Sequence, residues 1–395
     1  MAALDITQFP LVEIQAVANA QNEWVALTLR LKAFTDDATT AWHSVFDTPD
    51  LLTAVAPLDC VVFVDALATL TPALLTVMPA NRVVFVIKAE AMADDATRKQ
   101  TLALHDMGYR VMIDGPLAEG VKPAPTLRAV THDCRDGVPP CAAKKFALID
   151  IFGPHMAYNV NNGMRHNQCV AAGFAWFSGD YPLHPAPPVK PNDGTSRKRL
   201  LNLLGLVARD AESRELEALL KQDPALSYHL LKLVNSAAFA MATPITSFGQ
   251  AINLLGRRQL QRWLQLLLYA RQQQDGITNP LLPLAALRAA QLEALCKLQG
   301  GDRDAQDLAF MTGVFALLDV LFEMPMTEIV GALSLAPSAA DALLAREGRL
   351  GDLLRLTDQN APSLELLLKA GVEPAQYWQS QLHAYHWAIQ VSRNL

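Results

Sequence analysis

The sequence predicts two domains of different fold class, an α/β barrel followed by an all-helical domain. In residues 1–180, short apolar strands alternate with helix-compatible stretches, as in a parallel sheet that is covered on both faces. In residues 196–395, apolar residues recur at helical spacing throughout. Residues 181–195 hold five prolines, which disfavour helix and central strand, so we expect an extended linker there.

The strands of the first domain are predicted from runs rich in β-branched and aromatic residues. These runs are Cys60–Val64, Val83–Ile87, Tyr109–Ile113 and Phe146–Asp150, with an earlier one at Glu23–Leu31 and a later one at Gly173–Phe177. Asp94–Met107, between two of them, is compatible with a helix. A complete eight-fold α/β barrel usually needs about 250 residues. Because the first domain is shorter, we expect a trimmed barrel.

The helices of the second domain are predicted from caps and apolar spacing. Asp223-Pro224 is a favourable N-cap and first-turn pair, and apolar residues then share one helix face. Thr246 or Ser247 caps the next helix, which Gly256 ends, and residues 260–268 repeat the spacing. Further helical patterns occupy Leu284–Leu298, Ala305–Phe322, Pro337–Ala345, Leu350–Thr357, Ser363–Leu368 and Pro374–Val391.

The composition excludes several classes of protein. An apolar content of 51% with 18% charged residues excludes a mainly disordered chain. Residues 1–195 hold 14 basic and 20 acidic side chains and residues 196–395 hold 19 of each, so neither half has the basic excess of a typical nucleic-acid binder. The five scattered cysteines suit reduced thiols, and we recognise neither a secretory signal nor a membrane-spanning segment. We therefore expect a cytoplasmic protein without membrane association.

One stretch of the helical half is specific enough to indicate a family. Residues 223–239 read DPALSYHLLKLVNSAAF, and PITS, QAINLLG and RRQLQRW follow at 244–247, 250–256 and 257–263. Together with AREGRLG at 345–351, this text resembles the HDOD domain, a helical signalling module related to HD-type phosphohydrolases but without their metal site. The residues that carry the resemblance, in a structural or interaction role, are Asp223, Pro224, Asn235, Ser236, Gly256, Arg257, Arg258 and Trp263.

Next to an HDOD domain, the barrel half resembles a degenerate EAL domain. Active EAL domains hydrolyse cyclic di-GMP with two metal ions, held by several carboxylates and an Asn and helped by a Lys. By this resemblance, Ala26 stands where an EAL domain has its signature Glu, and Phe85 or Val86 stands where it has a second metal-binding Glu. Asp65 stands at the position of the family's metal-binding Asn. Of the family's two paired aspartates, this sequence keeps one, Asp114.

The remainder of the EAL pattern is also incomplete. Asp150 is kept, but the Lys two residues before it is lost. The final Glu-rich strand has no visible counterpart between Asp150 and Gly173, whereas residues 173–179 fit the exit strand. Asp65, Asp114 and Asp150 would therefore remain without the Glu ligands and the Lys, a set that holds metal poorly. The resemblance implies a pseudoenzyme with no catalytic residue, no metal ligand and no cofactor.

The favoured hypothesis is a non-catalytic bacterial signal transduction protein that senses or docks through the pseudo-EAL barrel and contacts signalling proteins through the HDOD domain. A cyclic dinucleotide stays open as a ligand, and nucleic acid is not expected. One alternative is a metal-dependent cyclic di-GMP phosphodiesterase that uses Asp65, Asp114 and Asp150. The other is a DNA-binding regulator that uses the arginines after Gly256, for which a solvated helix face is the simpler interpretation.

Other motifs have a simpler explanation than chemistry. Two His-Asp pairs, at His105 and His132, lie in the α/β half, away from the helical context of an HD-type site. Six residues, His132 among them, could in principle form a zinc site, but they lack two closely spaced couples. They are His132, Cys134, Cys141, His155, His166 and Cys169. We expect packing and loop roles for them, and a Cys134–Cys141 redox couple ranks lower still.

Overall fold

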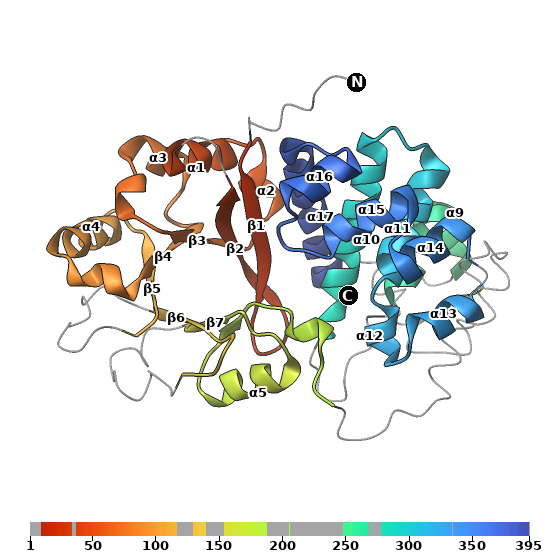
Figure 1. The fold of residues 1–395 in the computed structure, drawn as a ribbon, viewed down its shortest axis with the longest axis horizontal. Helices are drawn as coiled ribbons and strands as arrows, with labels where there is room; N and C mark the ends of the chain where they lie inside the picture. The colour runs from red at the N-terminus through yellow and green to blue at the C-terminus, as the bar shows by residue number, and fades with distance from the viewer. Residues whose placement is uncertain are drawn as a thin grey trace. The chain divides into compact units, whose positions relative to one another are not determined.

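The computed structural model describes residues 9–33, 37–116, 129–139, 154–187, 205, 248–267, 269, 278–333 and 335–394 (Figure 1). The chain divides into two compact units, residues 1–186 and 187–395. The division lies within the proline-rich segment. Each unit is described by itself.

The first unit is a closed barrel of eight strands in sequence order. The strands are β1 (Leu11–Ala18), β2 (Trp24–Ala33), β3 (Asp59–Val64), β4 (Val83–Lys88), β5 (Arg110–Asp114), β6 (Ala129–Asp133), β7 (Met156–Tyr158) and β8 (Trp176–Phe177). β1 runs antiparallel to both β2 and β8, and the other neighbours are parallel. This arrangement confirms the predicted α/β barrel.

Short helices accompany the strands on the outside of the barrel, where Figure 1 shows α1, α3 and α4. The α-helices are α1 (Ala38–Phe46), α2 (Leu51–Ala54), α3 (Pro72–Val77), α4 (Asp95–Asp106) and α5 (Gly163–Ala171). Side chains cap several of them: Asp37 accepts from the backbone N–H groups of Thr39 and Thr40, and Asp94 accepts from that of Thr97. Among the helices described in this unit, α2 and α3 have six residues or fewer, in line with a trimmed barrel.

Apolar side chains fill the barrel because each strand turns alternate residues inward. On β4, Val84 and Val86 join the interior cluster with Val61 of β3 and Met112 of β5. Phe85, between them, is also buried and packs on Tyr109 with ring centroids 5.1 Å apart. Strands that are buried on both sides explain why these runs contain so few polar residues.

Three strands were not predicted. β1 alternates apolar residues with Glu13 and Gln15, a pattern typical of a half-buried strand that could have revealed it. β6 includes polar residues, and β7 has only three residues, too few for any periodicity. β7 also lies between Asp150 and Gly173, where the EAL comparison found no strand, and that expectation was wrong. The predicted strand Phe146–Asp150 lies outside the described residues.

The proline-rich segment does not run extended from its first residue. Tyr181–Leu183 forms a 3-10 helix that contains Pro182. Tyr181 is buried, and its backbone N–H donates to Val160 O at 2.9 Å. Proline is tolerated in the first turn of a helix because the N–H groups there have no partner within the helix. The expectation of extended chain was therefore wrong for these three residues.

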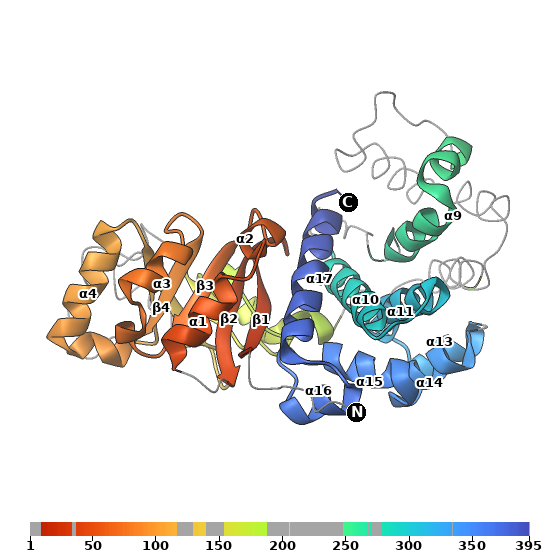
Figure 2. The same ribbon diagram turned by 90° about the horizontal axis from the view of Figure 1, so that it is seen from above.

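The described part of the second unit is all-helical, as predicted. Its helices are α9 (Phe248–Leu267), α10 (Leu281–Leu298), α11 (Arg303–Phe315), α12 (Leu318–Phe322), α13 (Met326–Ala332), α14 (Pro337–Ala345), α15 (Gly348–Thr357), α16 (Leu364–Ala370) and α17 (Pro374–Asn394). α10 packs against both α11 and α17 (Figure 2). Gly313 allows the α10–α11 approach, since a Cβ there would lie 2.6 Å from Ala289 Cα.

Gly256 interrupts α9 with φ 73° and ψ 156°, which confirms the predicted helix end. Residues 303–322 are apolar and long enough to span a membrane by composition, but 56% of their most apolar window is buried inside the protein. In the structure this stretch is divided between α11 and α12. Thr246 and Ser247, the expected caps, lie outside the described residues, as do Asp223, Pro224, Asn235 and Ser236 of the HDOD text.

Candidate functional site

A cavity of about 470 Å³ opens where the parallel strands of the barrel end. Asp65 directly follows β3, and Lys88, Asp114 and Tyr158 are the last residues of β4, β5 and β7. Arg30 of β2 also lines it. Carboxyl ends of parallel strands meet at one rim, which is where α/β barrels place their sites. The structure thus brings Asp65 and Asp114 to one cavity, while Asp150 lies outside the described residues.

Asp114 is held by two hydrogen bonds from neighbouring strands. Thr131 Oγ1 of β6 donates to Oδ1 at 3.0 Å, and Tyr158 Oη of β7 donates to Oδ2 at 2.9 Å. Burial, and secondly the Asp114 charge, raise the pKa of Tyr158 well above its usual value, so the phenol stays protonated and donates. Both carboxylate oxygens are therefore engaged by the protein itself, which fixes the position of the side chain.

A guanidinium and two rings form the adjacent wall of the cavity. The Arg30 guanidinium carbon lies 3.5 Å from the Phe63 ring centroid and 4.4 Å from that of Tyr158. The two rings meet edge to face with centroids 5.3 Å apart. Cation–π contacts of this kind hold an arginine in place while leaving its N–H groups available as donors. At the rim, Lys88 Nζ lies 3.0 Å from Asp65 Oδ1, and both side chains are exposed, so this pair contributes little stability.

The described residues do not fit the two-metal centre that the EAL resemblance implies. The resemblance assigns the two glutamate positions to Ala26 and to Phe85 or Val86, and the structure shows that all three of these residues are buried and apolar. In the part of the chain that the structure describes, no group of three or more His, Cys, Asp or Glu side chains is arranged to hold a metal ion. A two-metal site needs several converging oxygen ligands. We therefore derive no metal-dependent step from this cavity.

The histidines and cysteines considered for zinc pack within the barrel. His155 Nδ1 accepts the Val130 N–H at 3.2 Å, and His166 stacks on Tyr181 with centroids 4.3 Å apart. The Cys134 thiol is buried and hydrogen-bonds to that of Cys169. Cys141 lies outside the described residues.

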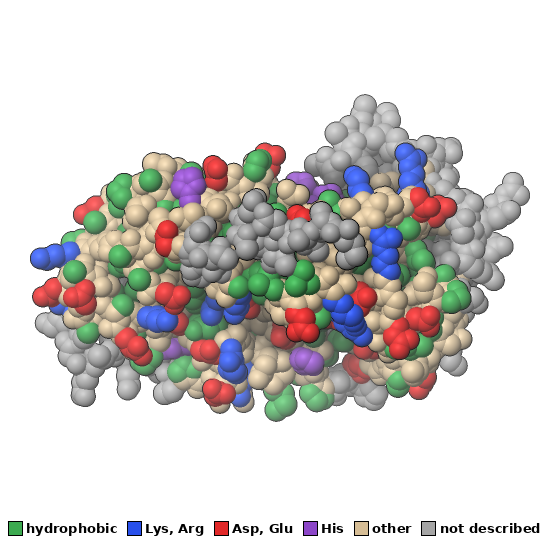
Figure 3. All heavy atoms as spheres, turned by 45° about the horizontal axis from the view of Figure 1, so that its top comes forward, with side chains coloured by type: hydrophobic (Ala, Val, Ile, Leu, Met, Phe, Trp, Pro, Cys, Tyr) green, Lys and Arg blue, Asp and Glu red, His purple; other side chains and the backbone are tan. Residues whose placement is uncertain are grey.

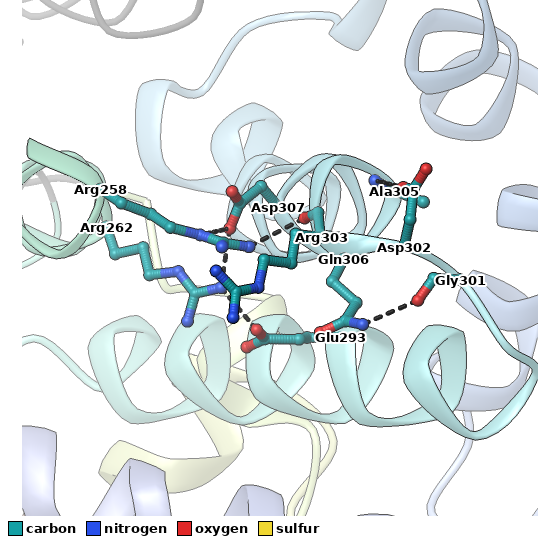
Figure 4. Close-up of polar contacts among 9 residues, drawn as sticks. All are labelled: Arg258, Arg262, Glu293, Gly301, Asp302, Arg303, Ala305, Gln306 and Asp307. Carbon is teal, nitrogen blue, oxygen red and sulfur yellow. Dashed lines mark hydrogen bonds and ion pairs between the residues drawn. The ribbon is translucent and has the colours of Figure 1, made fainter.

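Two of the arginines after Gly256, Arg258 and Arg262, form ion pairs and are not merely a solvated helix face. Figure 4 shows Arg258 and Arg262 reaching from α9 to Asp307 on α11 and Glu293 on α10. Arg262 is only 15% exposed, and its Nη2 lies 2.5 Å from Glu293 Oε1 and 2.8 Å from Asp307 Oδ1. Two described arginines are thus already paired with carboxylates, which disfavours the DNA-binding alternative. The side chain of Arg257 lies outside the described set.

The surface drawn in Figure 3 agrees with this view. Lys and Arg side chains are interspersed with Asp and Glu, and among the residues described on this face no continuous basic patch is seen. Trp263, another residue of the HDOD text, points inward and packs on Trp387 with ring centroids 5.1 Å apart. Its role in the described fold is to join α9 to α17.

Comparison with known proteins identifies the helical region. Residues 197–314 match the family model of the HDOD domain. The chain contains an HDOD domain. In this HDOD protein the module follows the EAL-like barrel, as the sequence resemblance predicted. The sequence motifs at residues 223–263 therefore predicted the correct family. Because the HDOD domain is a signalling module, the functional class that follows is signal transduction.

Two curated proteins are similar to this HDOD protein. "Uncharacterized protein YuxH" of Bacillus subtilis is 24% identical over 238 residues, which are 59% of this chain and 58% of YuxH. "Cyclic di-GMP phosphodiesterase CdgJ" of Vibrio cholerae is 29% identical over 204 residues, 51% of this chain and 47% of CdgJ. The chain thus spans about half the length of these relatives. Among solved structures, the EAL domain of Mycobacterium smegmatis DcpA matches 43% of this chain and 89% of its own, with 16% identity and a TM-score of 0.35.

Proposed function

We propose that this HDOD protein is a cytoplasmic bacterial signalling protein that acts by binding and not by catalysis, without a cofactor. The proposal rests on the side chains at the barrel mouth, the cavity where the parallel strands end. Both oxygens of Asp114 accept hydrogen bonds from Thr131 and Tyr158, and Ala26, to which the sequence resemblance assigns the signature Glu position, is buried. Among its described residues, a barrel so built keeps a cavity but has no group of carboxylates arranged to position metal ions and activate water.

The same cavity supports a binding role. Arg30 is held against two rings at the cavity wall, and a guanidinium is the side chain best suited to pair with phosphate oxygens. Lys88 adds a second cation at the rim, partly neutralised by Asp65. We propose a cyclic dinucleotide as the ligand, because the relative CdgJ is named for acting on cyclic di-GMP. The HDOD domain would then present a surface to a signalling protein.

The decisive experiment titrates cyclic di-GMP into the purified chain by calorimetry with Mg²⁺ or Mn²⁺, and then separates the nucleotides of the same sample by chromatography. We expect saturable binding and unchanged nucleotide. Arg30→Met should weaken binding at least about tenfold, because it removes a hydrogen bond to a charged group. Arg135→Met is the matched control, since Arg135 is an exposed barrel arginine that does not line the cavity.

The other outcomes contradict parts of the proposal. Linear dinucleotide in the chromatogram would overturn the non-catalytic role and favour the phosphodiesterase alternative, which Asp114→Ala would then abolish. Absence of both binding and product would refute the nucleotide as ligand of the barrel. Equal binding by the Arg30→Met and Arg135→Met variants would refute the site.

A further inference from the structure

The helical unit contains a second cavity, of about 730 Å³, that neither resemblance explains. It is lined by residues from the second half of α9 and by residues of α10, α11 and α17. Figure 4 shows part of its wall, where Arg262 and Glu293 face each other across α9 and α10. A cavity of this size is within the range of small-molecule sites.

Two buried N–H donors at this cavity have no acceptor among the described residues. They are Nε of Arg262 and Nε1 of Trp387. Leaving a buried donor unpaired costs free energy, and most such groups in folded proteins have a partner. A ligand that carries acceptor oxygens would supply one to each.

The charges around the cavity favour an anion. Arg258 and Arg262 share Asp307, and Arg262 also pairs with Glu293, so two cations balance two carboxylates. Lys297 of α10 lines the cavity, is exposed, and forms no ion pair within the described part of the chain. The net charge of this set is therefore +1.

The remaining titratable group at the wall adds little charge at neutral pH. His383 of α17 lines the cavity, and burial lowers its pKa below the ordinary histidine value. The Glu293 charge acts in the opposite direction, and Lys297 and His386 add to the lowering. The lowered pKa favours the neutral form of His383, which remains available as a hydrogen-bonding side chain.

The apolar part of the wall suits a flat molecule. Phe310 lies under the Arg262 guanidinium, 4.6 Å from ring centroid to Cζ, and Trp387 is tilted at 43° to Trp263. Ala290 and Ala294 of α10 also line the cavity, and their small side chains leave space beside these rings. Phe310 is buried beneath Arg262 and Trp263 is buried beside Trp387, so among these three rings the partly exposed Trp387 is the one that can stack on a flat ligand.

We propose that this cavity binds a planar organic anion, a molecule with a flat apolar body and a carboxylate, sulfonate or phosphate group. Its acid oxygens accept hydrogen bonds from Arg262 Nε and Trp387 Nε1, and Lys297 balances its charge. Such a ligand would contact four helices of the HDOD protein at once and stabilise their packing. This proposal is independent of the barrel function, because every residue of the cavity belongs to the helical unit.

The test uses two fluorescent probes that differ by one acid group. 8-Anilinonaphthalene-1-sulfonate has the sulfonate, and N-phenyl-1-naphthylamine has the same rings without it. Titrated into the full chain, the sulfonate should bind with one site per chain and at least about tenfold more tightly than the neutral probe. Lys297→Met should reduce sulfonate affinity at least about fivefold and leave the neutral probe unchanged, whereas Lys297→Arg should retain affinity within about twofold.

Two controls make the result specific. Lys99→Met changes an exposed lysine of α4 in the other unit and should leave both affinities unchanged. Trp387→Phe keeps a ring but removes the N–H, and should weaken the sulfonate several-fold with an unchanged far-ultraviolet circular dichroism spectrum. Equal affinity for the two probes, several weak sulfonate sites, or full affinity in Lys297→Met would overturn the proposal.

Discussion

Replacing Arg262 by methionine tests the ion-pair cluster that joins α9, α10 and α11. Methionine keeps an unbranched apolar side chain that can still pack on Phe310, while both ion pairs of Arg262 are lost. Asp307 retains Arg258 as a partner, but Glu293, 19% exposed, loses its ion pair with Arg262. The substitution therefore leaves one mostly buried carboxylate without a counter-charge.

The expected loss of stability follows from the burial of this pair. Removing one partner of a fully buried ion pair costs about 3–5 kcal/mol. Because Arg262 and Glu293 are 15% and 19% exposed, water compensates part of that cost, and we expect a loss of about 2–3 kcal/mol. Arg258→Met is the matched control: Arg258 and Asp307 are 39% and 37% exposed, and Asp307 keeps Arg262, so the loss should be about 1 kcal/mol or less.

The assay is urea unfolding of the full chain followed by far-ultraviolet circular dichroism, with hydrogen–deuterium exchange of the α10 peptide as the local readout. A double variant, Arg262→Met with Glu293→Gln, removes the unpaired charge and should recover about 1–2 kcal/mol relative to additivity. Equal losses in Arg262→Met and Arg258→Met, or strict additivity in the double variant, would refute the reasoning.

Two further predictions concern backbone conformation and pH. Gly256→Ala should destabilise the chain by about 1–3 kcal/mol in urea unfolding, because φ 73° with ψ 156° is a conformation that glycine adopts and alanine does not adopt readily. As the control, Gly331→Ala inside α13 should be neutral or slightly stabilising. Equal effects of the two substitutions would contradict this explanation. Burial lowers the pKa of His166 below 6.5, so this imidazole binds a proton more readily in the unfolded chain than in the folded one. The free energy of unfolding therefore has its full value above pH 6.5 and decreases as the pH falls below 6.5. His166→Phe keeps the stack on Tyr181 and should make the decline in thermal midpoint between pH 7 and 5 shallower. A slope should remain from His132 and His383, whose pKa values burial also lowers, and an unchanged slope would show that His166 is not responsible.

The local pattern of the sequence was sufficient for most of the fold. Apolar runs predicted β3, β4 and β5 because strands buried on both faces exclude polar residues. Gly256 predicted a helix end because only glycine adopts its backbone conformation readily. Strands β6 and β7 were missed because a polar or three-residue strand carries no periodicity and exists only through pairing with its neighbours.

The sequence by itself determined the order of the α/β and helical domains and the HDOD match, since each depends only on residue identity and local spacing. Only the tertiary structure showed that Tyr158 and Thr131 hold Asp114, and that Arg262 is paired with Glu293. The physical reason is the same in both places. Contacts between side chains on separate strands or helices depend on barrel closure and helix packing, which bring together residues that lie far apart in the chain.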